Sequence, residues 1–371
     1  MITPLLLVIG RFYPILRQLA LPHTRWIIIG LHLLLLASIG LQQGVLVDKE
    51  ALKYTGCASD VLHGDFADLS GSYLKYAGYI LFLLPFVALD NLWLAVIGQI
   101  IMGVVASEAL ARYAERLTGN VALGRIAMAL FLLCPLVQVW ALALYTEYFF
   151  TCMVILFVER LDRVPQVDAT TIGVGVLAFF ARPVGLFFVV PALFWRLRAR
   201  VSKPFSRWFF MVACAMLLVV ATTVPHIAAP QLEPIASGQV IAGVDGVSTE
   251  GFTGATIADA HHYLVDRVGL TEWIRITLRR TASLFNLTRP WFSNGHNAIN
   301  ALFFALYPLA LLGIVRWWKS ERVRLLLAIL ALNIAIVGLT HDEWSGRFVA
   351  PLLPWVIVLA CVSLQPSRPT A

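Results

Sequence analysis

The sequence predicts an all-α polytopic membrane protein, and three observations support this fold class. Of the 371 residues, 60% are hydrophobic and 13% are charged, with a mean hydropathy of +0.81, whereas about 25% of residues are charged in a typical soluble domain. Apolar runs of membrane-spanning length recur along the whole chain. Cations cluster beside these runs, as in "WRLRARVSKPFSRW" and "RWWKSERVR", which is typical of cytoplasmic loops.

The distribution of charge and cysteine excludes two other classes of protein. The net charge of +7 follows from the positive-inside rule, so it does not indicate a nucleic-acid partner. Cys134, Cys152, Cys214 and Cys361 lie in apolar runs and only Cys57 lies in a polar loop, so no disulfide framework is expected. The chain has no CxxC and no HExxH motif, and no residue is assigned to a metal.

Threading the apolar runs through a bilayer predicts about 8–11 membrane helices, some of them short or re-entrant, in a single integral membrane domain. This domain covers residues 1–371, with both termini in the cytoplasm and an interfacial amphipathic segment over the first 25 residues. The runs expected to cross are 26–44, 92–111, 121–139, 143–158, 208–224, 298–315, 325–339 and 349–364.

Two further apolar runs are interrupted. The run before Asp90 ends at "LDNLW", and the run 171–195 is broken at "FFARPVG". Pro183 prevents a continuous helix there and biases Ala181 and Arg182 toward extended backbone. Irregular backbone is tolerated at membrane depth only where it lines a cavity, so these short helices predict a cavity on the outer side.

Two loops are expected on the extracytoplasmic side. The first, 45–75, holds the first dense group of carboxylates, in "VDKEALKYTGCASDVLHGDF". The second, 226–297, has a length that indicates function or disorder. Its second half contains "LTEWIRITLRRTASLFNLTRPW", where Trp273, Ile276, Leu278 and Leu284 alternate with arginines. This pattern predicts an amphipathic helix at the membrane surface that carries cations.

Ionisable side chains from five separated segments converge on the expected outer face. The candidate acids are Asp48, Glu50 and Glu147, and the candidate cations are Lys75, Arg182, Arg279, Arg280 and Arg347. Charged groups at helix tips of a membrane protein are costly, and they commonly mark functional sites. Carboxylates suit removal of a proton from a hydroxyl group, and arginines suit bidentate contact with a phosphate.

Some of these residues also have a structural interpretation. Glu147 stands in an apolar hairpin tip with no cation near it in the sequence. Arg182 follows a helix break, and we expect it to contact either a phosphate or a carboxylate. Arg347 is close in sequence to Asp342 and Glu343, so a local ion pair is the alternative to a phosphate contact.

The ordered set of motifs resembles the GT-C superfamily of membrane glycosyltransferases, which includes protein mannosyltransferases and lipid A aminoarabinose transferases. The first loop is similar to that of the family at Glu50, Tyr54, Ala58, Leu62, Gly64 and Asp65. "YTEYFF", "ARPVGLFFVVPALF" and "GRFVAPLLP" resemble its next acidic loop, its Arg-Pro hairpin and its late Arg-aromatic element. The resemblance covers most of the chain, but Lys49 separates Asp48 from Glu50, so either could be the family's acid.

The resemblance implies an enzyme of the inner (plasma) membrane with a GT-C-like helix bundle. It would move a sugar from a polyprenyl-phosphate donor to a lipid or glycan acceptor on the outer face, in contact with membrane lipids. Asp48 or Glu50 would be the general base, with Glu147 the next candidate, and Tyr54 would join the substrate contacts. No cofactor is required, and assistance by a divalent cation is left open.

Two alternatives from other functional classes fit the same features. A transporter or flippase of lipid-linked saccharides would use the same arginines to bind the phosphate without making a covalent bond. A polysaccharide polymerase or ligase would share the large outer loop with its arginines.

Overall fold

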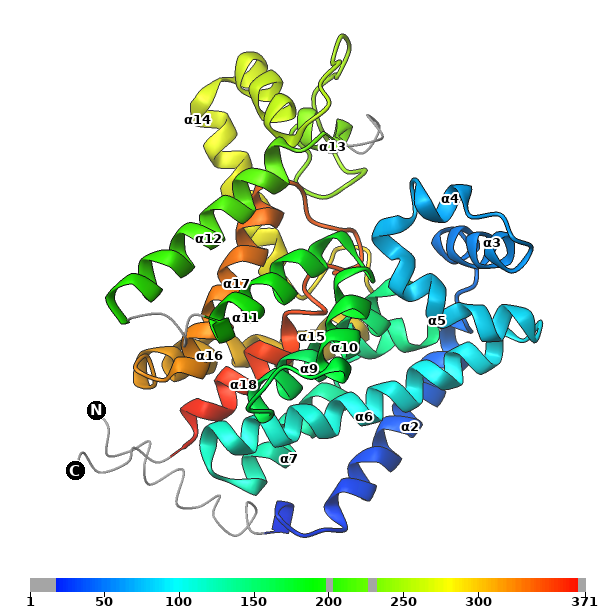
Figure 1. Cartoon of the computed structure of the whole chain (residues 1–371), viewed down its shortest axis with the longest axis vertical. Coiled ribbons are helices and arrows are strands. Elements are labelled where there is room, and N and C mark those ends of the chain that lie inside the picture. The colour runs from blue at the N-terminus through cyan, green and yellow to red at the C-terminus, as the bar shows by residue number, and fades with distance from the viewer. Residues whose placement is uncertain (1–17, 198–202, 226–231, 366–371) are drawn as a thin grey trace. The chain divides into compact units, whose positions relative to one another are not determined.

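The structure of the chain is a computed structural model that describes residues 18–197, 203–225 and 232–365 (Figure 1). Most of the expected interfacial segment, both termini and the first residues of the second outer loop lie outside this part. The chain divides into two compact units, which are described separately. Unit 1 comprises Met1–Gly185, Asn294–Arg324 and Ala350–Ala371, and unit 2 comprises Leu186–Ser293 and Leu325–Val349.

The all-α fold class is confirmed, because the described residues form helices and contain only isolated β-bridges. Four helices in this part of the chain are long and apolar enough to cross a membrane: Thr24–Gln43, Leu92–Thr118, Asn294–Arg316 and Glu321–Leu339. The bent pair Val121–Leu132 and Pro135–Leu142 makes a fifth if it is one span. The shorter apolar helices are Leu74–Ala88, Ala169–Phe179, Pro183–Leu197, Phe210–Thr223 and Leu353–Ser363.

Unit 1 holds most of the helices. They are α2 (Thr24–Gln43), α3 (Glu50–Leu62), α4 (Ala67–Ser70), η1 (Leu74–Tyr76), α5 (Ala77–Ala88), α6 (Leu92–Thr118), α7 (Val121–Leu132), α8 (Pro135–Gln138), η2 (Val139–Leu142), α9 (Thr146–Arg163), α10 (Ala169–Phe179), η3 (Pro183–Gly185), α15 (Asn294–Leu302), η6 (Phe303–Ala305), α16 (Leu306–Arg316) and α18 (Leu353–Ser363).

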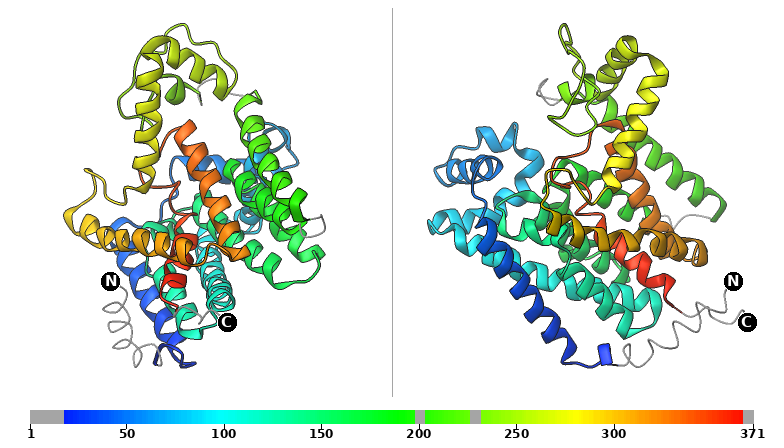
Figure 2. Two further views of the ribbon diagram at one scale, coloured as in Figure 1. Left: turned by 90° about the vertical axis from the view of Figure 1, so that its left-hand side faces the viewer. Right: turned by 180° about the vertical axis from the view of Figure 1, so that it is seen from behind.

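The core of unit 1 includes one helix, α18, that is apolar on every side. Each residue of α18 is buried, as expected for a helix without a polar face. Helix α6 packs against α7 and α9, and α16 packs against α18 (Figures 1 and 2). A Cβ on Gly103 would lie 1.9 Å from the Tyr148 hydroxyl, and one on Gly313 would lie 2.1 Å from the Leu359 carbonyl oxygen. Glycine therefore permits these close helix contacts.

Helix breaks occur at both predicted places and at one place that was not predicted. Asp90, with φ 49°, separates α5 from α6, and the second break lies between α10 and Pro183. The expected continuous run 121–139 is instead bent by 55° before Pro135, because proline cannot donate to the carbonyl four residues earlier. The Gln138 side chain donates to that carbonyl, Phe131 O, at 2.8 Å.

An ionic network joins the helix ends that are expected to be cytoplasmic. Glu159 of α9, which is 3% exposed, accepts from Arg112 at 3.4 Å and from Arg116 at 3.0 Å, both on α6. Asp162 pairs with Arg116 at 3.0 Å and with Arg322 at 2.6 Å. The buried Glu159 and the half-buried Asp162 each have more than one cationic partner, which compensates their charge.

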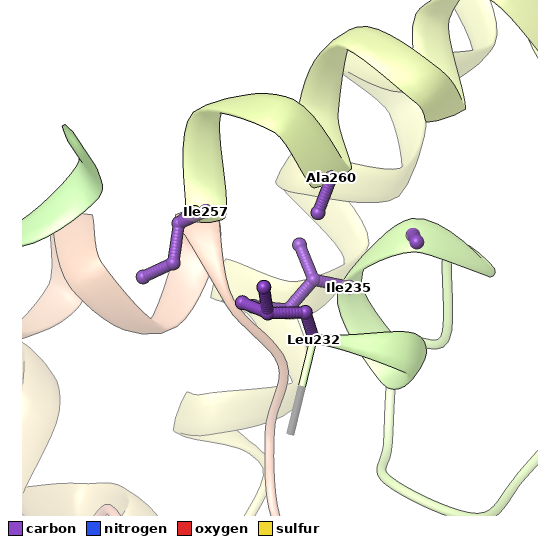
Figure 3. Packing of buried hydrophobic residues seen from close by; sticks show 5 residues of the cluster. Leu232, Ile235, Ile257 and Ala260 are labelled. Carbon is purple, nitrogen blue, oxygen red and sulfur yellow. The ribbon is translucent and has the colours of Figure 1, made fainter. Parts of the chain in front are cut away.

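Unit 2 contains α11 (Leu186–Leu197), α12 (Lys203–Thr223), α13 (Glu233–Ala236), α14 (Ile257–Phe285) and most of α17 (Glu321–Leu339). The described part of the second outer loop has a small hydrophobic core. Figure 3 shows Leu232, which precedes α13, and Ile235 of α13 facing Ile257 and Ala260 of α14. The loop therefore folds around its own apolar side chains.

The amphipathic helix predicted in this loop is α14, but one of its arginines, Arg280, lies on the buried apolar face. The helix begins with a capping box and bends at Gly269, whose φ is 79°. Ile276, Arg280 and Leu284 are buried, whereas Leu278 is 64% exposed. Residues spaced by four share one helix face, so Arg280 points inward with the apolar side chains.

We expect cysteines that replace Phe66 and Val247 to react with an impermeant thiol reagent in intact cells, in a background without native cysteines. Both positions are exposed, at 56% and 42%, and both lie in the loops assigned to the outer face. Cysteines at Gln166 and Lys319, which are also exposed, should react only after permeabilisation, because positive-rich loops stay inside. Labelling of Gln166 or Lys319 from outside would overturn the topology.

Candidate functional site

The first acidic segment of unit 1 is paired with the segment that leads into α9. Leu46 N donates to Leu142 O at 2.9 Å, and Leu144 N donates to Leu46 O at 3.0 Å, which makes a parallel bridge. The exposed Asp48 accepts a long hydrogen bond of 3.5 Å from the Tyr145 hydroxyl. Residues almost a hundred positions apart in the sequence are thus held side by side.

Helix α3 presents Glu50 at its first position, after Lys49 has turned the chain with a φ of 48°. The Glu50 Oε2 atom accepts from the Tyr54 hydroxyl at 3.3 Å, and Oε1 pairs with Lys53 at 2.7 Å. The side chain of Glu50 remains 31% exposed. The four-residue spacing places Glu50 and Tyr54 on one face of the helix.

Tyr54 is the centre of a group that we call the Tyr54 cluster, which consists of Glu50, Tyr54, Tyr76, Tyr79, Glu147 and Arg182. The Tyr54 ring is 1% exposed and lies edge-on to Tyr76 at 5.2 Å and to Tyr79 at 5.5 Å. Burial raises the pKa of the Tyr54 phenol, the neighbouring Tyr76, Glu147 and Glu50 raise it further, and Arg182 lowers it. Tyr54 is therefore a neutral hydrogen-bond donor among charged groups.

Lys75 borders the same cluster. Its ammonium nitrogen lies 5.6 Å from the centroid of the Tyr76 ring, a distance within the range of a cation–π contact. Tyr76 in turn contacts Tyr54. The structure thus brings Lys75, Glu50 and Tyr54, all predicted from the first loop, to one part of unit 1.

Glu147 and Arg182 form a buried ion pair. The Arg182 Nη1 and Glu147 Oε1 atoms are 2.9 Å apart, and the two residues are 6% and 0% exposed. Of the two partners expected for Arg182, the structure shows the carboxylate. Glu147 occupies the first turn of α9, where the helix dipole stabilises a negative charge.

The break before Pro183 holds Arg182 in place. Gly185 N donates to Arg182 O at 2.9 Å, and Gly78 N of α5 donates to Phe180 O at 2.8 Å. A Cβ on Gly78 would lie 2.5 Å from Leu177 O, so only glycine allows α5 to approach α10 this closely. The same approach brings Tyr76 and Tyr79, next to Gly78, toward the ion pair.

A buried glutamine that sequence analysis missed fixes the backbone before Glu147. Gln99, on α6 and 0% exposed, donates from Nε2 to Ala141 O at 3.2 Å and to Ala143 O at 3.0 Å. Its Oε1 atom accepts from the Tyr79 hydroxyl at 3.4 Å. A glutamine in the middle of an apolar helix was the available signal, because polar groups are rarely placed there without a role.

The three late arginines lie in unit 2 and have different surroundings. Arg279 is exposed and Arg347 is half-buried. Arg280 is fully buried, where its Nε donates to Gln239 O at 2.8 Å and its Nη2 to Ile235 O at 3.3 Å. These contacts tie α14 to the turn after α13, so Arg280 has a structural function inside the loop.

Asp342 pairs with an arginine that sequence analysis did not single out. Its Oδ2 atom lies 2.5 Å from Arg289 Nη2 and 2.7 Å from the Ser283 hydroxyl, and the Asp342 and Arg289 side chains are 1% and 3% exposed. Arg289 is 53 residues from Asp342 in the sequence. The two side chains meet because the segment after α14 and the loop after α17 pack together.

Two histidines of unit 2 are held in the neutral form. His261 Nδ1 accepts from the Trp273 indole at 2.9 Å, so its Nε2 carries the proton that it donates to Leu339 O at 2.7 Å. Burial lowers the pKa of His261, which Arg280 lowers further although the Leu339 contact raises it. Burial and Arg280 lower the pKa of His341 to about 4.

Among the described residues, no group of three or more His, Cys, Asp and Glu side chains could hold a metal ion. Comparison of the chain with known protein families, with curated proteins and with solved structures finds no match. The chemistry of the site therefore has to be inferred from the Tyr54 cluster itself. This cluster offers a partly exposed carboxylate, a neutral phenol donor and a guanidinium held by a second carboxylate.

Replacing either member of the buried ion pair should destabilise the protein by about 3–5 kcal/mol, because the remaining charge is left without its partner. We expect Glu147→Gln and Arg182→Gln each to lower the melting temperature of the purified protein. The double variant should cost much less than the sum of the two single variants, since both charges are then absent. Additive losses would show that the two side chains are not coupled.

Acid should weaken the fold of unit 2. The pKa values of His261 and His341 lie below 6.5 in the folded protein, so the unfolded chain binds more protons and stability falls as the pH drops. The loss begins near pH 6.5 and continues toward the folded pKa, which is about 4 for His341. Hydrogen exchange of α14 should accelerate between pH 7.5 and pH 5 after correction for the intrinsic rate.

The matched control for this experiment is the double variant His261→Gln and His341→Gln, which should show little change in α14 protection over the same pH range. Equal protection of the unmodified protein at both pH values would contradict the assignment.

Proposed function

We propose that this protein is an integral membrane glycosyltransferase that moves one sugar from a polyprenyl-phosphate donor to a hydroxyl group of a lipid or cell-surface glycan. The observation that carries the proposal is the Tyr54 cluster, in which three separated segments of an apolar helical chain bring acids and an arginine together. Such buried charge is costly, and function is the usual reason for it. By resemblance, the protein is a GT-C-like bundle of the inner membrane, with outer loops and cytoplasmic termini.

The proposed reaction has three linked changes. The acceptor oxygen attacks the anomeric carbon of the donor sugar, the bond from that carbon to the phosphate oxygen breaks, and polyprenyl phosphate leaves with the electron pair. The acceptor hydroxyl proton passes to a carboxylate of the protein. No cofactor enters this scheme.

Glu50 is the general base that the geometry favours. It is 31% exposed and accepts from the Tyr54 hydroxyl, so an acceptor hydroxyl can reach it. Glu147 is 0% exposed and holds Arg182, which suits a positioning function better than proton removal. Asp48 is exposed two residues before Glu50 and is the next candidate.

Arg182 and Lys75 are the proposed contacts of the donor phosphate. A planar guanidinium can contact two oxygen atoms of a phosphate at once, as it does with a carboxylate. Glu147 would keep Arg182 oriented when no donor is bound. When the donor binds, its phosphate and the Glu147 carboxylate would both contact the guanidinium. Since bidentate contact needs the planar fork, lysine would not replace Arg182.

We expect Glu50→Gln to lower the turnover of sugar transfer by at least about 10²-fold while expression and donor binding stay normal, because Gln cannot take the proton. The measurement is transfer by the purified protein with a panel of radiolabelled polyprenyl-phosphate sugars. Asp60→Asn removes an exposed carboxylate from the same helix and should have little effect.

The general base is a different residue if transfer stays near the wild-type rate in Glu50→Gln, in Asp48→Asn and in their double variant. Glu147 is then the next residue to test. The flippase alternative is tested in the same membranes with a fluorescent lipid-linked sugar. A flippase would translocate this lipid without forming product, and Glu50→Gln would not abolish translocation.

A further inference from the structure

Unit 2 carries a stacked pair of tryptophans at its surface. The rings of Trp291 and Trp344 are 4.1 Å apart with an interplanar angle of 20°. The Trp291 indole N–H also donates to Trp344 O at 3.2 Å. Trp344 is 45% exposed, so one face of its ring is covered by Trp291 while much of the ring remains accessible.

The pair is held in place by the buried ion pair beneath it. Arg289 lies two residues before Trp291, and Asp342 lies two residues before Trp344. The Arg289–Asp342 contact of 2.5 Å and the Ser283–Asp342 hydrogen bond of 2.7 Å therefore fix both tryptophan-bearing segments. An aromatic surface that is ordered before a ligand arrives loses little entropy on binding.

The residues beside Trp344 in the sequence are polar or glycine. They are Glu343, Ser345, Gly346 and Arg347. In the described residues 319–349, Trp344 is the one large hydrophobic side chain that is exposed, and residues 279–298 contribute none. A bilayer contact would be expected to show a continuous apolar patch, and these two segments do not form one around Trp344.

We propose that Trp344, backed by Trp291, is a binding platform for one saccharide ring. A pyranose has an apolar C–H face and a rim of hydroxyl groups, so it matches an exposed indole with polar residues beside it in the sequence. Its polarised C–H groups are attracted by the negative face of the indole. The inference rests on the proposed sugar chemistry for the identity of the ligand.

The test uses the full-length protein labelled with 5-fluorotryptophan in nanodiscs, with the Trp344 fluorine signal assigned by Trp344→Phe. Methyl glycosides of common hexoses, pentoses and N-acetylhexosamines are titrated, with glycerol as a control polyol. We expect at least one glycoside to shift the Trp344 signal saturably with a Kd in the millimolar range. Trp93, which is 63% exposed on α6, serves as the matched control and should not shift.

The rival explanation is that Trp344 belongs to the aromatic belt at the membrane interface. A lipid spin-labelled on its acyl chain should broaden the Trp93 signal and leave Trp344 sharp. Broadening of Trp344 equal to that of Trp93, or no shift of Trp344 with any glycoside, would overturn the platform.

Failure of the proposed binding site at Trp344 and failure of the proposed reaction can be told apart. Glycoside binding at Trp344 in a protein without transferase activity would contradict the proposed function and support the platform. Sugar transfer by a protein whose Trp344 signal does not shift with any glycoside would contradict the platform and support the proposed function.

Discussion

The ion pair between Glu147 and Arg182 is the constraint on which the candidate site of unit 1 depends. Two charges that are almost completely buried can persist among apolar helices only if each compensates the other. Glu147 occupies the first turn of α9, and Arg182 occupies the break between α10 and η3. A helix start and a helix break of unit 1 thus hold the two charges that pair.

The neighbouring polar contacts follow from the same constraint. A chain segment that leaves the helix exposes its carbonyl groups, and in an apolar core these need donors. Gln99 supplies them for Ala141 and Ala143, and the Leu46 bridge pairs the segment from its other side. Because the bridge also leads into α3, satisfying the backbone before Glu147 brings Glu50 and Tyr54 toward the ion pair.

Sequence reasoning predicted what is encoded locally. The break before Pro183 depends on residues within one helical turn, and the structure contains it. The partner of Glu147 could not be predicted, since it lies 35 residues away and is reached only after α9, α10 and α5 have packed. The inward side of Arg280 could have been predicted from its spacing to Ile276 and Leu284, whereas the Arg289–Asp342 pair depends on packing within unit 2.

The length of α6 determines how deep this site lies in a bilayer. Its 27 residues span about 40 Å at about 1.5 Å per residue, which exceeds the roughly 30 Å of hydrocarbon. With Arg116 at the inner headgroups, Gln99 is 17 residues further along and thus about 25 Å away, still among the acyl chains. The carbonyl groups of Ala141 and Ala143, which the Gln99 side chain holds, would then lie within the hydrocarbon layer, where no water could replace the two hydrogen bonds that Gln99 donates.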